Sequence, residues 1–396
     1  MKFSVMRRLD LYMGYLLCHL LSFIYKIGGI KKRRIADSES LDIKKVLVIK
    51  FLGFGSTIMT TPFMRELKKN YSQSEIHFLT FFDNVQICES IKLIDRTFYL
   101  DKKSLWKFIL TLVKTLYQIR RQNYDIAFNL EFFSNFSLLL AALSKSKLTI
   151  CFGGRHEYRK TISQKIVSYE NEVHIIDKFC NFLKILKIIP TPESKPLMEL
   201  NENPEAKRSI SDILKKRKVD ISKDFLVIVN INSGEMSRIR MWPLEYYQQV
   251  ISFLLGKKEI RIILVGGKED VSYVSHLERK IVEGRDRVIN LAGLISLKEL
   301  ISLMKVGNLY LGNDSGPLHL AEACGLPNVS FFGPESPKVY GHSGDKNYIF
   351  YSNLPCSPCL NVYTNKDTRC NDNICLKMIG PEEVIKVLEE KYFKEP

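Results

Sequence analysis

The stretch KVLVIKFLGFGS, residues 45–56, decides the fold that this sequence predicts. Its first seven residues form an apolar run typical of a strand that is buried on both faces of a parallel sheet. A turn with two glycines follows at residues 53–56, and a helical pattern then covers residues 57–70. The stretch therefore predicts the strand, turn and helix that begin a βα unit.

The same alternation of strand and helix runs through both halves of the chain. In the first half, further strands are predicted at residues 75–80, 97–100, 124–130 and 148–152, with helical stretches such as 104–121 between them. The second half begins again with FLVIVNIN at residues 225–232, and strands follow at residues 260–266, 288–291, 309–312 and 328–332. Two such runs predict an α/β protein with two doubly wound, Rossmann-like domains that face each other across a cleft.

The predicted organisation has five parts. They are a basic amphipathic segment (1–40), a first domain (41–190), a proline-rich linker (191–205), a second domain (206–380) and a C-terminal helix (381–396). We expect that last helix to return to the first domain. Because ligands of open α/β sheets bind at the carboxyl ends of the strands, chemistry is expected in the turns that follow them.

Charge and apolar residues suggest an anionic partner. Lysine and arginine outnumber the acidic residues by 59 to 43, a net charge of +16, and residues 1–35 carry eight basic groups against Asp10 alone. The apolar stretch at residues 9–27 is interrupted, so it is too short to span a bilayer, and it lacks a cleavage site for a signal peptidase. Two interpretations stay open: a helix that lies on an anionic membrane surface, and a helix packed on the protein itself. Nucleic acid ranks last as a partner because no nucleic-acid-binding motif is present.

Two turns in the second half are suited to bind phosphate. Residues 312–321, GNDSGPLHLA, follow a strand and begin a helix with Asp314 or Ser315 as its cap, and a helix N-terminus attracts anions. His319 lies in the first turn of that helix, where it can donate to a phosphate oxygen. The loop at residues 232–243 carries two arginines before Trp-Pro, and an arginine there would clamp a diphosphate. Glu269 follows the next strand and is a candidate acceptor for a ribose hydroxyl.

Four segments, in this order, resemble glycosyltransferase family 9, the ADP-heptose:lipopolysaccharide heptosyltransferases and their relatives. They are VLVIKFLGFGSTIMTTPFMRELKK (46–69), NSGEMSRIRMWPLEYY (232–247), ILVGG (263–267) and the region 290–334 that contains GNDSGPLHLAEACG. The resemblance runs from about residue 44 to the C-terminus. It implies the two-domain GT-B fold, an acceptor domain followed by a donor domain, and inverting sugar transfer from a nucleotide diphosphate without metal or cofactor.

The resemblance also assigns the donor site. It implies that Asp314, Ser315, Gly316 and His319 hold the diphosphate, that Arg240 takes the place of the family's usual lysine, and that Glu269 faces the nucleoside. Gly53 and Gly55 would let the backbone approach the acceptor or the donor sugar.

The catalytic base departs from the family pattern. Heptosyltransferases carry an aspartate directly after the glycine of the first βα turn, and this chain has Ser56 there. Serine is a poor base without a partner, so Glu131 and Asp83, which follow two predicted strands, are the candidates for removing the acceptor proton. The alternative is a non-catalytic GT-B protein that binds nucleotide sugar or glycan.

The resulting hypothesis is a glycosyltransferase at the cytoplasmic face of the inner membrane, with heptose as the first guess for the sugar and a lipopolysaccharide core or another glycolipid as acceptor. Nine cysteines in a long chain argue against a secreted disulfide scaffold. Near the C-terminus Cys356, Cys359, Cys370 and Cys375 have spacing that would suit a local structural feature or, as a minority hypothesis, a metal site.

Overall fold

The computed structural model describes residues 3–27, 42–191, 197, 200–234, 238–342, 344–360, 362 and 368–393. The chain divides into two units, residues 1–198 and 199–396. Several predicted features lie outside the described residues: Lys2, Lys31, Lys32, Arg33 and Arg34 of the basic segment, part of the linker, and the last three residues.

The first unit is a doubly wound α/β sheet. Its strands are β1 (Lys45–Ile49), β2 (Glu75–Phe81), β3 (Arg96–Leu100), β4 (Ile126–Asn129), β5 (Leu148–Phe152) and β6 (Lys165–Val167). They are all parallel and lie in the order β3-β2-β1-β4-β5-β6. The strand order reverses between β1 and β4, which makes the carboxyl ends of these two strands the switch point where such sheets bind ligands.

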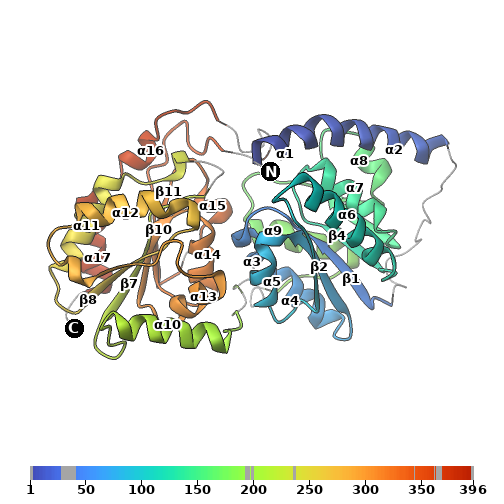
Figure 1. Cartoon of the computed structure of the whole chain (residues 1–396). Helices are drawn as coiled ribbons and strands as arrows, with labels where there is room; N and C mark the ends of the chain where they lie inside the picture. Colours follow the sequence, from blue (N-terminus) through green and yellow to red (C-terminus); the bar gives the residue numbers. More distant parts are fainter. Residues whose placement is uncertain are drawn as a thin grey trace. The chain divides into compact units, whose positions relative to one another are not determined.

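Helices cover both faces of this sheet (Figure 1). They are α1 (Phe3–Leu9), α2 (Tyr15–Ile27), α3 (Phe54–Ile58), α4 (Thr61–Asn70), α5 (Val85–Glu89), α6 (Leu105–Arg120), α7 (Asn135–Leu143), α8 (Tyr158–Ile162) and α9 (Ile175–Cys180). The single helix predicted at residues 57–70 is instead two helices, because α3 starts at Phe54 and α4 begins again with Pro62 in its first turn.

The second unit repeats the same topology. Its strands are β7 (Phe225–Asn230), β8 (Ile260–Leu264), β9 (Val288–Asn290), β10 (Leu309–Asn313), β11 (Asn328–Phe332) and β12 (Asn347–Tyr351). They are parallel in the order β12-β11-β10-β7-β8-β9, so the switch point lies between β7 and β10. The sequence did not predict β6 or β12. Both lie at an edge of their sheet and have side chains that are only partly buried.

The helices of the second unit are α10 (Pro204–Lys216), α11 (Leu244–Leu255), α12 (Val271–Lys280), α13 (Leu297–Val306), α14 (Gly316–Ala323), α15 (Pro337–Tyr340), α16 (Ile374–Lys377) and α17 (Pro381–Tyr392). The expectation that the last helix returns to the first domain is wrong. Val384 and Leu388 of α17 are buried in the core that α11 and α12 form with the second sheet, and the Tyr392 hydroxyl donates to the Asn328 and Lys346 carbonyls. The apolar face of α17 is thus buried within the second unit.

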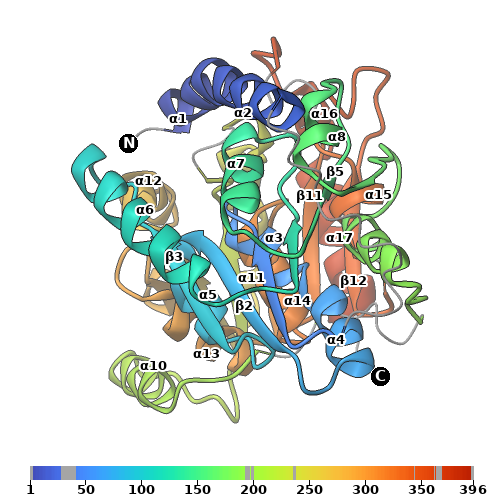
Figure 2. The same cartoon turned by 90° about the vertical axis from the view of Figure 1, so that its right-hand side faces the viewer.

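The N-terminal helices α1 and α2 lie on the first unit, joined by a π-helical turn at Asp10–Gly14 (Figure 2). Cys18 and Ser22 of α2 are buried, and the Asp10 carboxylate accepts from the backbone N–H groups of Asn135 and Phe136 at the start of α7. An anion at a helix N-terminus is favourable, so Asp10 anchors the segment. Among the described residues, no helix has the length and apolar character needed to cross a membrane.

Candidate functional site

The turn after β10 is the polar centre of the second unit. Asp314 and Ser315 follow the strand at its switch point and are largely buried, and α14 begins at Gly316 with Pro317 in its first turn. Proline has no N–H group to satisfy there, and the Leu318 N–H donates to the Ser315 carbonyl at 3.1 Å, so Ser315 and Gly316 hold the backbone N–H groups nearest the start of the helix. A turn at the start of a helix can bind an anion, which is the role that the sequence predicts for this one.

Arg240 is held beside this turn. Its Nη2 donates to the Ser233 carbonyl at 2.7 Å, and its Nη1 lies 3.4 Å from Asp314 Oδ2. The Nε of this buried guanidinium has no hydrogen-bond partner among the described residues. A buried donor without a partner is costly, so this N–H is the group that a bound anion would satisfy.

Two asparagines fix the loop that carries Arg240. Asn313 accepts from the Trp242 backbone N–H at 2.8 Å and donates to the Ile231 carbonyl at 3.0 Å, which ties the loop to the switch point. Asn373, from the chain just before α16, donates to the carbonyls on both sides of Arg240. The Trp242 ring is fully buried and stacks on Phe331. These contacts hold the arginine in place without using its charge.

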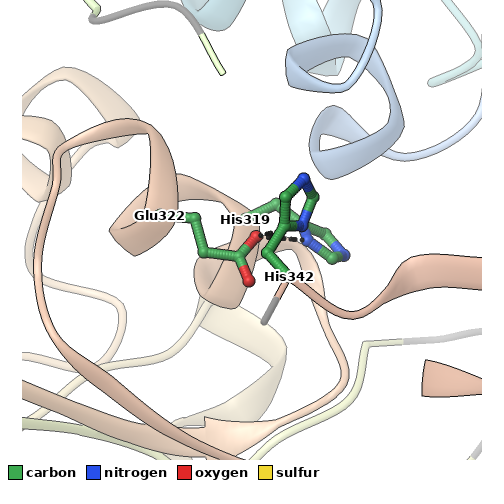
Figure 3. A group of neighbouring side chains, drawn as sticks. All are labelled: His319, Glu322 and His342. Atoms are coloured by element: carbon green, nitrogen blue, oxygen red, sulfur yellow. Dashed lines mark hydrogen bonds and ion pairs between the residues drawn. The ribbon is translucent and has the colours of Figure 1, made fainter. Parts of the chain in front are cut away.

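His319 belongs to a cluster with Glu322 and His342, drawn in Figure 3. Oε2 of Glu322 lies 3.0 Å from Nδ1 of His319 and 3.0 Å from Nδ1 of His342, while Nε2 of His319 lies 3.9 Å from Asp314 Oδ1. Burial raises the pKa of Glu322, but hydrogen bonds from the two histidines lower it by more, so its pKa ends below the ordinary value. The Glu322 carboxylate thus orients the His319 ring, so that Nδ1 faces Glu322 and Nε2 faces Asp314 in the turn after β10.

The same three side chains are the candidate metal ligands. Their ligand atoms all lie within 4.8 Å of one another, and two histidines with one carboxylate suit a transition metal. Across the described ranges, the four C-terminal cysteines form no group of three or more that meets this spacing. The four thiols nevertheless lie near one another. Burial raises the pKa of Cys375, and repulsion from the nearby Cys359 adds to this, so that the pKa is about 11.

The switch point of the first unit holds an ion pair. Oε1 of Glu131, which follows β4, accepts from Lys50 Nζ at 2.9 Å and from the backbone N–H groups of Phe51 and Leu52 at 2.6 and 2.8 Å. Both side chains are almost completely buried. Glu131 therefore fixes the chain as it leaves β1, and Oε2 is the oxygen left for other chemistry.

The other predicted residues of the first unit lie near its first turn. Gly53 precedes α3 with a φ of +75°, a conformation that favours glycine, while Gly55 and Ser56 lie within α3. Gly55 is buried and Ser56 is half-buried. Asp83 is exposed and pairs with Lys102 at 3.0 Å.

Glu269 is exposed in a turn of 3-10 helix after β8. Within the described residues no hydrogen bond or ion pair joins it to Arg240, Asp314 or His319. The turn is held instead by Asp270, which accepts from the Gly267 N–H at 2.9 Å.

Sequence reasoning missed four residues of the site. Glu322 lies three positions after His319 on the same helix, a spacing that places two side chains on one face and was a usable signal. Asn313 directly follows the strand predicted at residues 309–312, and sequence reasoning assigned it no role. His342 and Asn373 are distant in the sequence, and no local pattern indicates them.

Comparison with solved structures shows that the fold is that of the GT-B glycosyltransferases. The structure matches the glycosyl transferase family 9 protein from Veillonella parvula with a TM-score of 0.73, 23% identity and coverage of 90% of this chain and 99% of the other. It matches ADP-heptose lps heptosyltransferase II of E. coli with a TM-score of 0.69, 18% identity and coverage of 87% and 98%.

The sequence comparison identifies the family. The model of glycosyltransferase family 9 (heptosyltransferase) matches residues 112–368, and this chain belongs to that family. Lipopolysaccharide heptosyltransferase 3 of Escherichia coli K12 is 25% identical over 289 residues, which are 70% of this chain and 79% of the relative. The predictions of the family, the α/β fold class and glycosyltransferase activity are thus confirmed.

Proposed function

We propose that this enzyme transfers heptose from ADP-heptose to a lipopolysaccharide core or a related glycolipid, with inversion at the anomeric carbon and without a metal ion. The names of its relatives support this donor and acceptor: the E. coli structure is an ADP-heptose lps heptosyltransferase, and the K12 relative is a lipopolysaccharide heptosyltransferase. The observation that carries the proposal is Arg240 beside the first turn of α14.

The donor diphosphate would bind at the start of α14. The N–H groups of Ser315 and Gly316 and the Arg240 guanidinium would bind its oxygens, and His319, in its doubly protonated form, would be a further donor through Nε2. Proline supplies no N–H, so Ser315 and Gly316 are the backbone donors of this turn. Charge develops on the diphosphate as the bond to the sugar breaks, and donors already in place stabilise it without reorganisation.

Asp314 would position Arg240 and His319. Its two oxygens lie 3.4 Å from Nη1 of Arg240 and 3.9 Å from Nε2 of His319. Asp314→Asn should therefore weaken binding of a nucleoside diphosphate while the protein stays folded. Unchanged affinity in calorimetry would remove Asp314 from the donor site.

Glu131 is the proposed base for the acceptor hydroxyl. The three donors on Oε1 fix its carboxylate at the switch point of the first unit, and Oε2 would accept the proton. Asp83 is exposed and paired with Lys102, and Ser56 has no basic partner among its described contacts, so both are weaker candidates.

The reaction can be tested with a panel of nucleotide sugars that includes ADP-heptose, measuring release of the nucleoside diphosphate with and without a glycolipid extract. We expect release only with ADP-heptose and extract together. Glu131→Gln should lower this release by at least about 100-fold and keep the affinity for ADP. Release from another donor would refute the heptose assignment, and full activity of Glu131→Gln would refute the base.

We also propose that residues 3–27 attach the enzyme peripherally to an anionic membrane. Their inner face packs on the first unit, while large apolar side chains of α1, the π-helical turn and α2 point outward. Both interpretations of this segment are thus compatible: it packs on the protein and offers an apolar outer face to lipid.

A further inference from the structure

Helix α6 has apolar side chains on two sides. On its inner side Phe108, Leu112 and Leu116 pack against the core of the first unit. On its outer side lie exposed large apolar residues, called here the α6 face: Leu105, Trp106, Ile109, Leu110, Val113 and Tyr117. A surface helix normally turns polar residues outward, and a contiguous exposed apolar patch marks an interaction site.

The charges around the α6 face favour an anionic partner. Residues 102–121 contain six basic residues and no acidic one. Lys107 and Lys114 are exposed on the helix, and Arg121 just beyond it donates to the Tyr117 hydroxyl at 2.9 Å. Lysine and arginine beside an apolar stripe can reach phosphate groups while tryptophan and tyrosine occupy the headgroup level of a bilayer.

Helix α6 lies in the same unit as the N-terminal helices and shares packing partners with them. Met6 of α1 packs against the same buried cluster as Phe108 and Leu112 of α6, and α7 contacts both segments (Figure 2). Residues 9–27 expose a second set of apolar side chains from the same unit. Two apolar helices with basic residues and hardly any acidic ones are what an anionic lipid surface binds.

We infer that the α6 face inserts into the headgroup region of an anionic bilayer, as a second attachment beside residues 3–27. A single interfacial helix could roll about its axis, whereas two attachments on one rigid unit fix its orientation toward the membrane. Because the second contact forms at high effective concentration once the first has formed, both together bind more tightly than either alone.

Tryptophan fluorescence can test whether the α6 face contacts lipid. It has two tryptophans: Trp106 on the α6 face is 74% exposed, and Trp242 in the second unit is fully buried. Adding vesicles of phosphatidylglycerol and phosphatidylethanolamine to the full-length protein should shift the Trp106 emission to shorter wavelength. Acyl chains brominated near the headgroup should quench it. Trp106→Phe should remove both changes, because Trp242 has no access to lipid.

A matched pair of variants tests the affinity. Trp106→Ser, Leu110→Ser and Val113→Ser together should weaken vesicle binding at least about tenfold in sedimentation, since one of two linked attachments is lost. The control carries Val282→Ser, Leu294→Ser and Met378→Ser, which remove three exposed apolar side chains from the second unit and should bind like the wild type. Neutral phosphatidylcholine vesicles should bind the wild type more weakly than anionic ones.

Three results would overturn the inference. They are sedimentation with vesicles without any change in Trp106 emission, binding by the triple α6 variant that equals the wild type, and a blue shift that needs only higher protein concentration. The last would show that a second copy of the chain covers the α6 face. The vesicles contain neither sugar donor nor lipopolysaccharide, so these results are independent of whether the proposed heptose transfer is correct.

Discussion

The two units have the same strand order but different chemistry at their switch points. In the first unit Lys50 and Glu131 meet there, and each is bonded to the other and to nearby backbone groups. In the second unit Arg240, Asp314 and His319 meet, with looser contacts of 3.4 and 3.9 Å and an unpartnered Arg240 Nε within the described residues. The two switch points therefore share their topology and differ in how closely their charged side chains pair.

The comparison predicts that equivalent substitutions have different consequences. A cation removed from the first switch point should cost stability, because its charges already serve each other. A cation removed from the second should cost ligand affinity, because the Arg240–Asp314 ion pair is longer and the Arg240 Nε has no hydrogen-bond partner among the described residues. Lys50→Met and Arg240→Met test this difference, and Glu322→Gln tests the position of His319.

Lys50→Met should have the largest effect, a loss of stability. It leaves the Glu131 carboxylate buried without its counter-ion, so the free energy of unfolding should fall by about 3–5 kcal/mol. Urea denaturation followed by circular dichroism measures it. Lys147→Met is the control, because the Lys147 ion pair with Asp125 is formed by a largely exposed ammonium and should contribute at most about 1 kcal/mol. Equal stability of both variants would contradict the assigned role of Lys50.

Arg240→Met should have the next largest effect. It removes charged hydrogen bonds to a diphosphate, so the dissociation constant for ADP should rise about 100-fold in calorimetry. Arg240→Lys keeps the charge and should stay within about tenfold of the wild type. Arg238→Met, which changes an exposed arginine of the same turn, should leave the affinity as it is. An ADP affinity that does not respond to Arg240→Met would mean that the second switch point is not the donor site.

The smallest effect is expected for Glu322→Gln, through the position of His319. ADP binding should weaken about tenfold, because the amide holds the imidazole less firmly than a carboxylate does. The histidines keep the pKa of Glu322 below its ordinary value of 4.5. A depressed pKa means that the folded state prefers the charged carboxylate. The resulting stabilisation is present above the pKa of the unfolded state, and it is lost as the pH falls through the pKa of the folded state.

The direction of this pKa shift predicts how the stability of Glu322→Gln depends on pH. Glu322→Gln should be less stable than the wild type at about pH 6, and the difference should shrink as the pH falls through the lowered pKa of the wild-type carboxylate. Urea midpoints of both proteins across this range measure it. A difference that stays constant with pH would show that Glu322 acts through packing and not through its charge.

The sequence predicted most of the fold because the signals for it are local. Buried parallel strands such as Leu148–Phe152 and Asn328–Phe332 are short apolar runs, and the structure has them at the predicted residues. The edge strands β6 and β12 were missed because an edge strand needs no such run. The destination of the last helix was predicted wrongly, because an amphipathic pattern shows that a helix has a partner without showing which one.

The turn that is proposed to bind the donor was recognisable for a similar reason. A strand end, a capping residue, a proline and a histidine lie within ten consecutive residues, so their chemistry can be read without tertiary structure. The partners that support the turn come from residues 23 and more positions away, as His342 and Asn373 do, and a single sequence has no local signal for such distances.

By itself the sequence determined two doubly wound units and the strand, turn and helix at which anion binding is proposed, because periodicity, capping and glycine placement act over a few residues. Only the tertiary structure decided which charges meet. It bonded Glu131 to Lys50, set Glu322 between two histidines, and left the outer side of α6 apolar. The physical reason is that burial and electrostatics depend on distances in space, and folding brings together side chains that the sequence keeps far apart.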